Sequence, residues 1–506
     1  MATRTQSYDC GAGEMPLIGI TIGKAFDKTV RKFPDREAYV SRHQGIRWTY
    51  LELKGKVDAF AAGLIALGLE PGDRIGIWSP NRIEWIVTQF ATAKTGLILV
   101  NINPAYRLHE LEYALNKSGC KAIITAAAFK TSRYLEMLQE LCPELDGATP
   151  GDLHAKKIPA LRTVIRMDAE KTPGMYNFDT VYGLGEATHI KRLKALEERL
   201  QFDDPINIQF TSGTTGSPKG ATLSHHNILN NANTCKASLR LTEKDRVCVP
   251  VPMYHCFGMV MCSLANTLAG ATSIFSDNAY DPQTVLETVT EEKCTILHGV
   301  PTMFIAELEH SDFEKSDLRH LRTGFIGGAP CPLEVMKLIL DRMNMKEITI
   351  AYGMTELSPV VTTTAPDDSL VRRTSTIGRA QPHQEVKIVD EDGRIVPVGM
   401  PGELCVRGYN VMIGYWDDPE RTDEAIDKAG WMHTGDLAKM DAHGYMNIVG
   451  RIKDMVIRGG ENLYPREIEE FLFQHPKIQD VQVFGIPSPK FGEELCAWIK
   501  LREGEI

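Results

Sequence analysis

The sequence of 506 residues lacks the features that would indicate a membrane span, a secreted disulfide framework or a zinc-binding motif. It has no uninterrupted apolar run long enough to cross a bilayer, and residues 1–10 lack the apolar stretch of a signal peptide. Its eleven cysteines include no C-x-x-C pair and have mostly apolar neighbours. Such cysteines are typical of buried free thiols in a reducing compartment.

The sequence also lacks a basic cluster that could offset its net charge of −10. Proteins that bind a phosphate backbone carry a basic face, so we expect no nucleic-acid partner. With 43% apolar and 24% charged residues of both signs, the composition is that of a globular enzyme. The length is too great for one ordinary core and predicts several packed units.

Helix and strand periods alternate through the first third of the chain, which predicts an α/β fold with a mostly parallel sheet. We expect helices over residues 49–67, 82–94 and 108–116, and strands over 73–78, 97–100 and 121–125. Residues 205–370 repeat this style, so the chain has two doubly wound subdomains, the first over about 20–200. Short strands separated by glycines predict a small β-barrel-like subdomain over 376–450.

A glycine- and hydroxyl-rich segment, residues 211–220, carries one charge, that of Lys219. It follows an alternating strand at 206–210 and precedes a helix that opens on Ser224, so we expect free N–H groups and a helix dipole to form an anion site. An ordinary surface linker is the alternative, because the same residue types make loops. The segment is not a Walker loop, because Pro218 precedes the lysine and Gly220 follows it.

The segment at 211–220 resembles the phosphate loop of the adenylate-forming superfamily, which includes acyl-CoA synthetases, peptide-synthetase adenylation domains and luciferases. Further motifs of that superfamily follow in its order, at residues 252–258, 327–330, 352–356, 402–408, 431–436 and 450–462. Within it, residues 204–213 and 453–465 are most similar to medium-chain acyl-CoA ligases of the "acyl-CoA synthetase family member 2" type and their bacterial relatives. The resemblance implies a large N-terminal domain, residues 1–452, and a small α+β C-terminal domain, here 453–506 and incomplete.

The resemblance implies a reaction in two steps, in which a fatty acid and ATP give an acyl-adenylate and coenzyme A then displaces AMP. Both first substrates are anionic, so the site must neutralise charge. Glu356 is implied as the Mg²⁺ ligand, and Asp436 and Arg451 as the ribose contacts. The full set of residues implied to bind ATP is Thr211, Ser212, Gly213, Thr214, Thr215, Gly216, Ser217, Pro218, Lys219, Gly328, Tyr352, Asp436 and Arg451.

The same resemblance places the acyl and CoA sites. Catalytic roles are implied for Thr355, Glu356 and His255, with His255 gating the carboxylate end of the acyl site. Lys453 is implied as a hinge about which the small domain rotates between the two steps. The implied CoA tunnel is lined by Gly459, Gly460 and Glu461, and the expected walls of the acyl pocket are Met253, Phe257, Met259 and Met261.

We expect a medium-chain fatty acid–CoA ligase, AMP-forming, that acts in lipid metabolism. The family's adenylation lysine lies in a glycine-lysine motif downstream of the hinge, and residues 454–506 contain no such motif. The alternative is therefore a truncated, catalytically impaired protein that binds ATP or acyl-adenylate. An adenylation domain and a luciferase-type oxygenase share the motifs. The expected compartment is the mitochondrial matrix in a eukaryote or the cytoplasm in a bacterium; chain-length preference and oligomeric state stay open.

Overall fold

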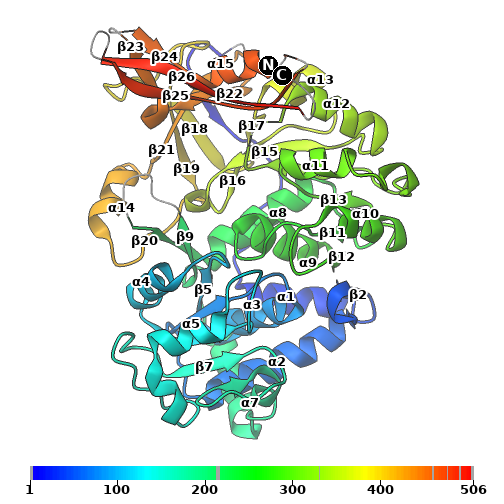
Figure 1. The fold of residues 1–506 in the computed structure, drawn as a ribbon, viewed down its shortest axis with the longest axis vertical. Coiled ribbons are helices and arrows are strands. Elements are labelled where there is room, and N and C mark those ends of the chain that lie inside the picture. Colours follow the sequence, from blue (N-terminus) through cyan, green and yellow to red (C-terminus); the bar gives the residue numbers. More distant parts are fainter. Residues whose placement is uncertain are drawn as a thin grey trace.

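The computed structural model describes residues 4–211, 217–329, 331–458, 461–473, 475, 477–488 and 492–502. In this part of the chain the strands form five sheets, with helices packed around them (Figure 1). The α/β class predicted from the sequence is confirmed, including a small α+β unit at the C-terminal end.

The largest sheet has eight strands in the order β20-β10-β9-β5-β4-β6-β7-β8. Strands β9 to β8 run parallel, whereas β10 and β20 run antiparallel to their neighbours. All five residues of β5 are buried, as is typical of a parallel strand covered on both faces. The strands span Arg74–Trp78 (β4), Ile98–Ile102 (β5), Cys120–Thr125 (β6), Thr163–Arg166 (β7), Tyr176–Asn177 (β8), Pro205–Thr211 (β9), Lys219–Ser224 (β10) and Gly414–Tyr415 (β20).

Two further sheets form the second α/β part, in the orders β13-β11-β12-β2-β3 and β14-β15-β16-β17. Their strands do not follow the predicted division at residue 205, because β2 and β3 come from the N-terminal part and β9 and β10 belong to the eight-stranded sheet. The strands span Glu37–Ser41 (β2), Ile46–Thr49 (β3), Arg246–Cys248 (β11), Thr272–Phe275 (β12), Ile296–Leu297 (β13), Phe325–Gly327 (β14), Thr349–Gly353 (β15), Val360–Thr363 (β16) and Arg379–Ala380 (β17).

The last two sheets are antiparallel. One has the order β1-β18-β19-β21-β22 and corresponds to the predicted barrel-like unit, with an N-terminal strand that the sequence did not predict; the other has the order β24-β23-β26-β25. Their strands span Tyr8–Cys10 (β1), Gln384–Val389 (β18), Gly402–Gly408 (β19), Met432–Met440 (β21), Met446–Arg451 (β22), Val456–Arg458 (β23), Glu461–Leu463 (β24), Ile478–Ser488 (β25) and Gly492–Leu501 (β26).

The three helices that the sequence predicts by residue range are α2, α3 and α4, and each begins and ends within two residues of its predicted bounds. The helix expected over 49–67 is α2, and Thr49 and Glu52 form a capping box at its start. The helices span Ile22–Lys32 (α1), Tyr50–Ala66 (α2), Ile83–Thr95 (α3), Leu108–Ser118 (α4), Tyr134–Leu141 (α5), Phe178–Val181 (α6), Ala187–Arg199 (α7), His225–Ser238 (α8), Ala265–Ala269 (α9), Pro282–Glu291 (α10), Pro301–Leu308 (α11), Leu333–Arg342 (α12), Leu370–Ser375 (α13), Pro419–Ala425 (α14) and Pro465–Leu472 (α15).

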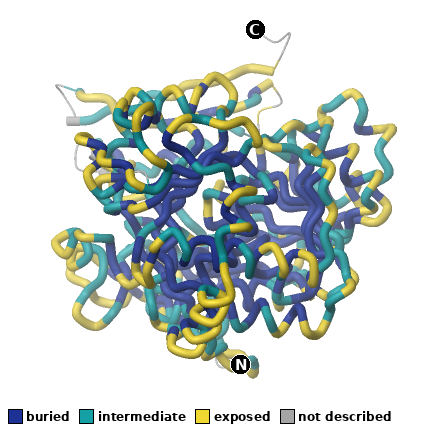
Figure 2. Tube along the Cα trace, turned by 90° about the horizontal axis from the view of Figure 1, so that it is seen from below, coloured by how far each residue is buried: buried dark blue, intermediate teal, exposed yellow. Residues whose placement is uncertain are grey.

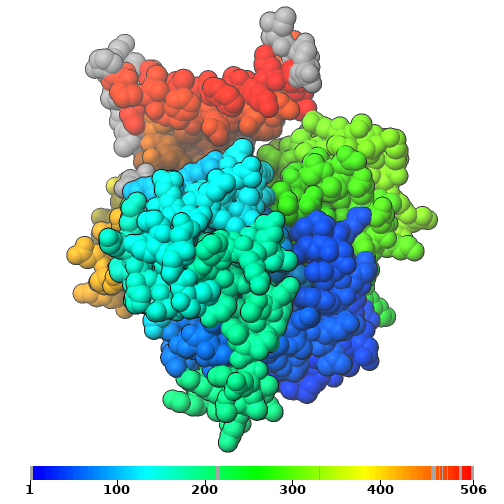
Figure 3. Space-filling view, turned by 60° about the horizontal axis from the view of Figure 1, so that its bottom comes forward, coloured from blue at the N-terminus to red at the C-terminus, as the bar shows by residue number. Residues whose placement is uncertain are grey.

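The buried residues gather on the stacked strands in the middle of the molecule, and exposed residues form its rim (Figure 2). The small C-terminal sheet has a separate core, in which Ile478, Val481 and Val483 pack against α15. In Figure 3 this sheet caps one end of the larger body. No helix in the described ranges is both long and apolar enough to span a membrane.

A buried lysine joins four helices of the N-terminal part. The side chain of Lys94, on α3, is 1% exposed and contacts Asp27 of α1, Asp58 of α2 and Glu197 of α7. Burial opposes its charge, and the three carboxylates more than compensate, so the pKa of Lys94 is raised. The lysine therefore stays charged and fixes how these helices pack.

We expect Lys94→Met to lower the free energy of unfolding by about 3 kcal/mol, because it leaves carboxylates without their buried partner. Lys54→Met is the matched control, since Lys54 contacts Asp27 and Asp58 from a more exposed position. It should cost less than about 1 kcal/mol. Urea unfolding followed by tryptophan fluorescence measures both, and equal losses would contradict the role given to Lys94.

Candidate functional site

The predicted phosphate loop connects two antiparallel strands. Thr211 ends β9 and pairs directly with Lys219 at the start of β10; Ser212, Gly213, Thr214, Thr215 and Gly216 lie outside the described residues. The strand-to-helix turn predicted from the sequence is therefore wrong. Ser224 does cap α8, accepting a hydrogen bond from the Asn227 N–H. It lies at the far end of β10, about 17 Å from the loop at 3.3–3.4 Å per residue, so the dipole of α8 is not directed at the loop.

A buried carboxylate, that of Glu356, stands at the base of the loop. Glu356 is 5% exposed, and its Oε1 accepts hydrogen bonds from Thr211 Oγ1 at 3.2 Å and Tyr415 Oη at 2.9 Å. Lys219 Nζ lies 4.5 Å from the centroid of the Tyr415 ring. Burial and the Glu356 charge raise the pKa of Tyr415, which keeps its hydroxyl protonated as a donor. One tyrosine thus contacts both charges, the lysine cation through its ring and the carboxylate through its hydroxyl.

Glu356 fits the role of a Mg²⁺ ligand. Among the described residues, both hydrogen bonds to its carboxylate are accepted by Oε1, which leaves Oε2 for a hard cation. The segment itself is held by a hydrogen bond from the Met412 N–H to the Glu356 carbonyl at 2.9 Å. A carboxylate oxygen with room for water is the kind of ligand that Mg²⁺ takes in phosphate sites.

Tyr352, Asp436 and Arg451, three residues predicted to bind the nucleoside, lie in contact. Tyr352 Oη donates to Asp436 Oδ2 at 2.6 Å, and Arg451 Nε donates to Asp436 Oδ1 at 3.1 Å. Burial and then the Asp436 charge raise the pKa of Tyr352. A carboxylate offers about four acceptor positions, so Asp436 keeps capacity for the two hydroxyls of a ribose.

Asp436 owes its direction to an interruption of strand β21. Cys405 pairs with His433 and Glu403 with Leu437, so residues 434–436 stand opposite one residue of β19. Thr434 Oγ1 donates to the Leu404 carbonyl at 2.7 Å, and Glu403 accepts from the Gly435 N–H at 3.1 Å and pairs with His433 Nδ1 at 2.8 Å. Gly435 has φ of +71°, which favours glycine. A bulge of this kind re-aims a side chain.

The motif at 252–258 meets the segment that carries Glu356. Cys256 Sγ lies 3.7 Å from Thr355 Oγ1, and the exposed His255 accepts from the Phe257 N–H through Nδ1 at 3.1 Å. A π-helix, Phe257–Leu264, begins here, and such helices are frequent at functional sites. The residues predicted to form the acyl pocket walls are all buried: Met253, Phe257, Met259 and Met261.

The glycine motif at 327–330 approaches the same region. A Cβ on Gly327 would lie 3.2 Å from the Ala351 carbonyl oxygen and 3.8 Å from the Phe257 ring. Gly328 is exposed with φ of +79°, so this position also favours glycine; Pro330 lies outside the described residues. The backbone here runs close to β15 and to the predicted acyl wall.

The predicted hinge residue, Lys453, is exposed on a short 3₁₀ turn, Ile452–Asp454, between β22 of the large body and β23 of the small sheet. A short 3₁₀ turn between elements is a common form of connector. Of the predicted CoA-tunnel residues, Gly459 and Gly460 lie outside the described residues and Glu461 begins β24. Ser217 is exposed, and the Pro218 carbonyl accepts from Tyr113 Oη at 3.1 Å.

Sequence reasoning missed two residues of this site, Tyr415 and Glu403. Tyr415 lies in a two-residue strand on the edge of β10, and nothing in its local sequence indicates that neighbour. Glu403 stands inside a motif that was recognised, at 402–408, and its approach to residue 435 could have been suspected from the order of the antiparallel strands.

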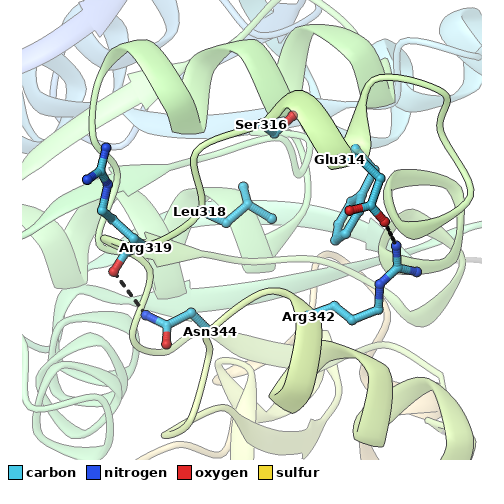
Figure 4. A pocket seen from close by; sticks show the side chains of 7 residues that line it. Glu314, Ser316, Leu318, Arg319, Arg342 and Asn344 are labelled. Carbon is cyan, nitrogen blue, oxygen red and sulfur yellow. Dashed lines mark hydrogen bonds and ion pairs between the residues drawn. The ribbon is translucent and has the colours of Figure 1, made fainter.

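A surface pocket of about 310 Å³ lies away from these residues (Figure 4). Its arginines are already paired, Arg342 with Glu314 and Arg319 with Asp317. It contains none of the predicted site residues, so it adds nothing to the candidate site.

Comparisons with known proteins identify a family and close relatives of the chain. The model of the AMP-binding enzyme family matches residues 26–416. The chain is 50% identical to the acyl-CoA synthetase YngI of Bacillus subtilis, over 97% of this chain and 89% of the relative. It is 48% identical to the mitochondrial medium-chain acyl-CoA ligase ACSF2 of Danio rerio, over 99% of this chain and 83% of the relative.

Solved structures give the same fold. ATP-bound MatB from Rhodopseudomonas palustris superposes with a TM-score of 0.78 at 28% identity, over 96% of this chain and 90% of MatB. The anthranilate CoA ligase AuaEII has a TM-score of 0.83 at 23% identity, over 97% of this chain and 89% of that chain. The extent of the matches gives no support to the alternative of a truncated, impaired binding protein.

We expect Glu403→Ala to loosen the bulge at 434–436. Losing a charge-assisted hydrogen bond of about 1.5–3 kcal/mol should raise the exchange rate of the Gly435 amide at least about tenfold. Hydrogen exchange read on a peptide that covers 431–437 measures this. Glu385→Ala is the control, because Glu385 lies on the same sheet and pairs with Arg407 and Tyr8. Unchanged exchange in Glu403→Ala would contradict the holding role.

Proposed function

We propose that this chain, which belongs to the AMP-binding enzyme family, is an ATP-dependent fatty acid–CoA ligase with a preference for medium-chain acids. The reaction joins a carboxylate to the α-phosphate of ATP with release of pyrophosphate, and then transfers the acyl group to the thiol of CoA with release of AMP. The assignment to the acyl-CoA ligases is supported by relatives of that activity over nearly the whole chain.

The observation that carries the proposal is the placement of one segment, residues 352–356. Tyr352 at its start contacts Asp436, and Glu356 at its end contacts Thr211 at the base of the loop. The segment therefore links a nucleoside end with a polyphosphate end, as a bound ATP requires.

In the first step, Lys219 is the cation that would hold the β- and γ-phosphates, with the loop 211–218 around them. Release of its contact with the Tyr415 ring would let the ammonium turn to the phosphates. Asp436 would accept from the ribose hydroxyls, and Arg451, which donates to Asp436 Oδ1, would keep that carboxylate oriented. Mg²⁺ on Glu356 would supply positive charge to the phosphate oxygens. These groups lower the repulsion between two anionic substrates.

In the second step, a thiol must reach the same acyl carbon after pyrophosphate has left. The 3₁₀ turn at Lys453 would let the small domain change its face toward the site, bringing residues 459–461 near the thiol. His255 is exposed and directly precedes Cys256, which contacts Thr355; its ring would stand between the acyl pocket and the α-phosphate. The proposed compartment depends on the source of the chain. It is the mitochondrial matrix in a eukaryote, since ACSF2 is mitochondrial, or the cytoplasm in a bacterium.

We expect AMP formation with CoA to peak at medium chain length when unbranched acids from acetate to palmitate are compared. The reason is that relatives of the chain are medium-chain acyl-CoA ligases; the expected acyl pocket would be lined by flexible methionines, Met253 on a turn and Met259 and Met261 on the π-helix. Each acid is assayed for AMP release with and without CoA. A flat profile, or a maximum at acetate or palmitate, would refute the medium-chain preference while leaving the ligase assignment standing.

We expect Lys219→Met to lower kcat/KM for ATP by about 10²–10³-fold, the usual loss when one preorganised electrostatic group is removed. Methionine keeps the length of the side chain and its packing on Tyr415. Lys244→Met is the control, since Lys244 is exposed before β11 and should leave the rate unchanged. If both variants release pyrophosphate at the same rate, the proposed role of Lys219 in holding the phosphates is wrong.

A further inference from the structure

A cluster of three potential metal ligands lies beside the bulge that carries Asp436. His433 Nδ1 is 2.8 Å from Glu403 Oε2 and 3.6 Å from Cys405 Sγ. The three ligand atoms lie within 4.8 Å of one another. Cys405 and His433 are direct cross-strand partners on β19 and β21, so the backbone fixes their separation.

Thiolate, imidazole and carboxylate together are the ligand set of borderline transition metals such as Zn²⁺. With Zn–S near 2.3 Å and Zn–N near 2.05 Å, a tetrahedral site has a sulfur-to-nitrogen edge of about 3.6 Å. The distance between Cys405 and His433 equals that edge. The edge between His433 and Glu403 is shorter because a hydrogen bond closes it, and it would open by about 0.5 Å around an ion.

The surroundings hold these ligands in place. The second oxygen of Glu403 accepts from the Gly435 N–H, which leaves Oε2 for an ion. Asp427 Oδ2 lies 4.0 Å from His433 Nε2, on the far side of the imidazole, while its Oδ1 accepts from the Trp431 N–H. Carboxylates in that position commonly orient a metal-bound histidine. One positive charge lies near the cluster and would oppose the binding of a cation, that of Lys387. This lysine pairs with Cys405 across β18 and β19, and its Nζ lies 4.5 Å from the centroid of the Trp431 ring.

We propose that Glu403, Cys405 and His433 form a binding site for Zn²⁺ or a similar borderline divalent metal ion, with water in the fourth position. On binding, the thiol proton of Cys405 goes to solvent, and the imidazole proton moves from Nδ1 to Nε2, facing Asp427. No electron is transferred. The site is separate from the oxygen ligand Glu356 and does not depend on the proposed ligase activity.

Occupation of this site would act on the nucleotide site through two residues. Glu403 accepts from the N–H of Gly435, the middle residue of the bulge, and His433 directly precedes Thr434, its first residue. An ion between Glu403 and His433 therefore restrains the first part of the bulge. Asp436, the proposed ribose contact, directly follows Gly435 and is the last residue of the bulge. The ion is therefore expected to change nucleotide affinity, and by linkage nucleotide changes metal affinity by the same factor.

Titration with Co²⁺ tests the site without using activity. The purified chain carrying Cys10→Ser and Cys496→Ser, which removes the two thiols that are not buried, should bind one equivalent of Co²⁺. The expected signature is a thiolate-to-cobalt charge-transfer band with the visible bands of a four-coordinate ion. Zn²⁺ should bleach it. An ion at Glu356 has only oxygen ligands and gives no such band, and absence of the band overturns the proposal.

Two variants assign the ligands. Cys405→Ser should abolish the charge-transfer band, and His433→Gln should weaken cobalt binding strongly; retention of the unaltered band in either overturns the assignment. His433→Gln keeps the test open if Cys405→Ser does not fold. Asp427→Asn preserves the acceptor for Trp431 and should weaken binding about tenfold. Glu385→Gln, on the same sheet but outside the cluster, is the matched control and should bind as the parent does.

Discussion

The carboxylate of Glu356 is the constraint on which the rest of the site depends. It is buried, and a buried carboxylate is tolerated only when donors surround it. Its donors come from β9 through Thr211 and from β20 through Tyr415. These strands are about two hundred residues apart in the chain, and in the eight-stranded sheet only β10 lies between them. Satisfying one charge therefore joins the segment that carries Glu356 to the end of β9, at the base of the loop, and to the strand β20.

The same logic explains why the nucleoside end is built on irregular backbone. Regular β21 would place residues 434–436 in alternating directions along the sheet. The bulge instead directs Asp436 to Tyr352 and Arg451, while Glu403 and the Leu404 carbonyl accept the hydrogen bonds that the interrupted ladder leaves open. The cost of irregular backbone is offset by hydrogen bonds to a charged group, which are the stronger kind.

The sequence predicted the helices and strands themselves better than it predicted which of them lie side by side in the fold. Apolar periodicity is local, so the helix α2 and the buried strand β5 could be predicted from their own residues. The predicted strand-to-helix turn at the loop was wrong because the short apolar pattern of β10 is typical both of a strand and of the start of a helix. Only the pairing of β10 with β9 decides between the two. The N-terminal strand β1 and the contact of Tyr415 with Glu356 depend on pairings across hundreds of residues, which no local pattern encodes. Motif order predicted Asp436 as a site residue, but it did not predict the bulge that directs its side chain.

The proposed position of the hinge, at Lys453, is compatible with the contacts that the strands make. Arg451 is the last residue of β22 and pairs in register with Asp436 on β21, so its contact with Asp436 belongs to the large body. Lys453 lies two residues later, beyond the strand. A rotation about Lys453 would therefore leave Tyr352, Asp436 and Arg451 in contact. It would change which face of the small C-terminal sheet is turned toward the site. A nucleoside held by these three residues could stay in place as pyrophosphate leaves and a thiol arrives. Such a division requires the pivot to follow the last ribose contact in the chain, and the order of Arg451 and Lys453 meets that requirement.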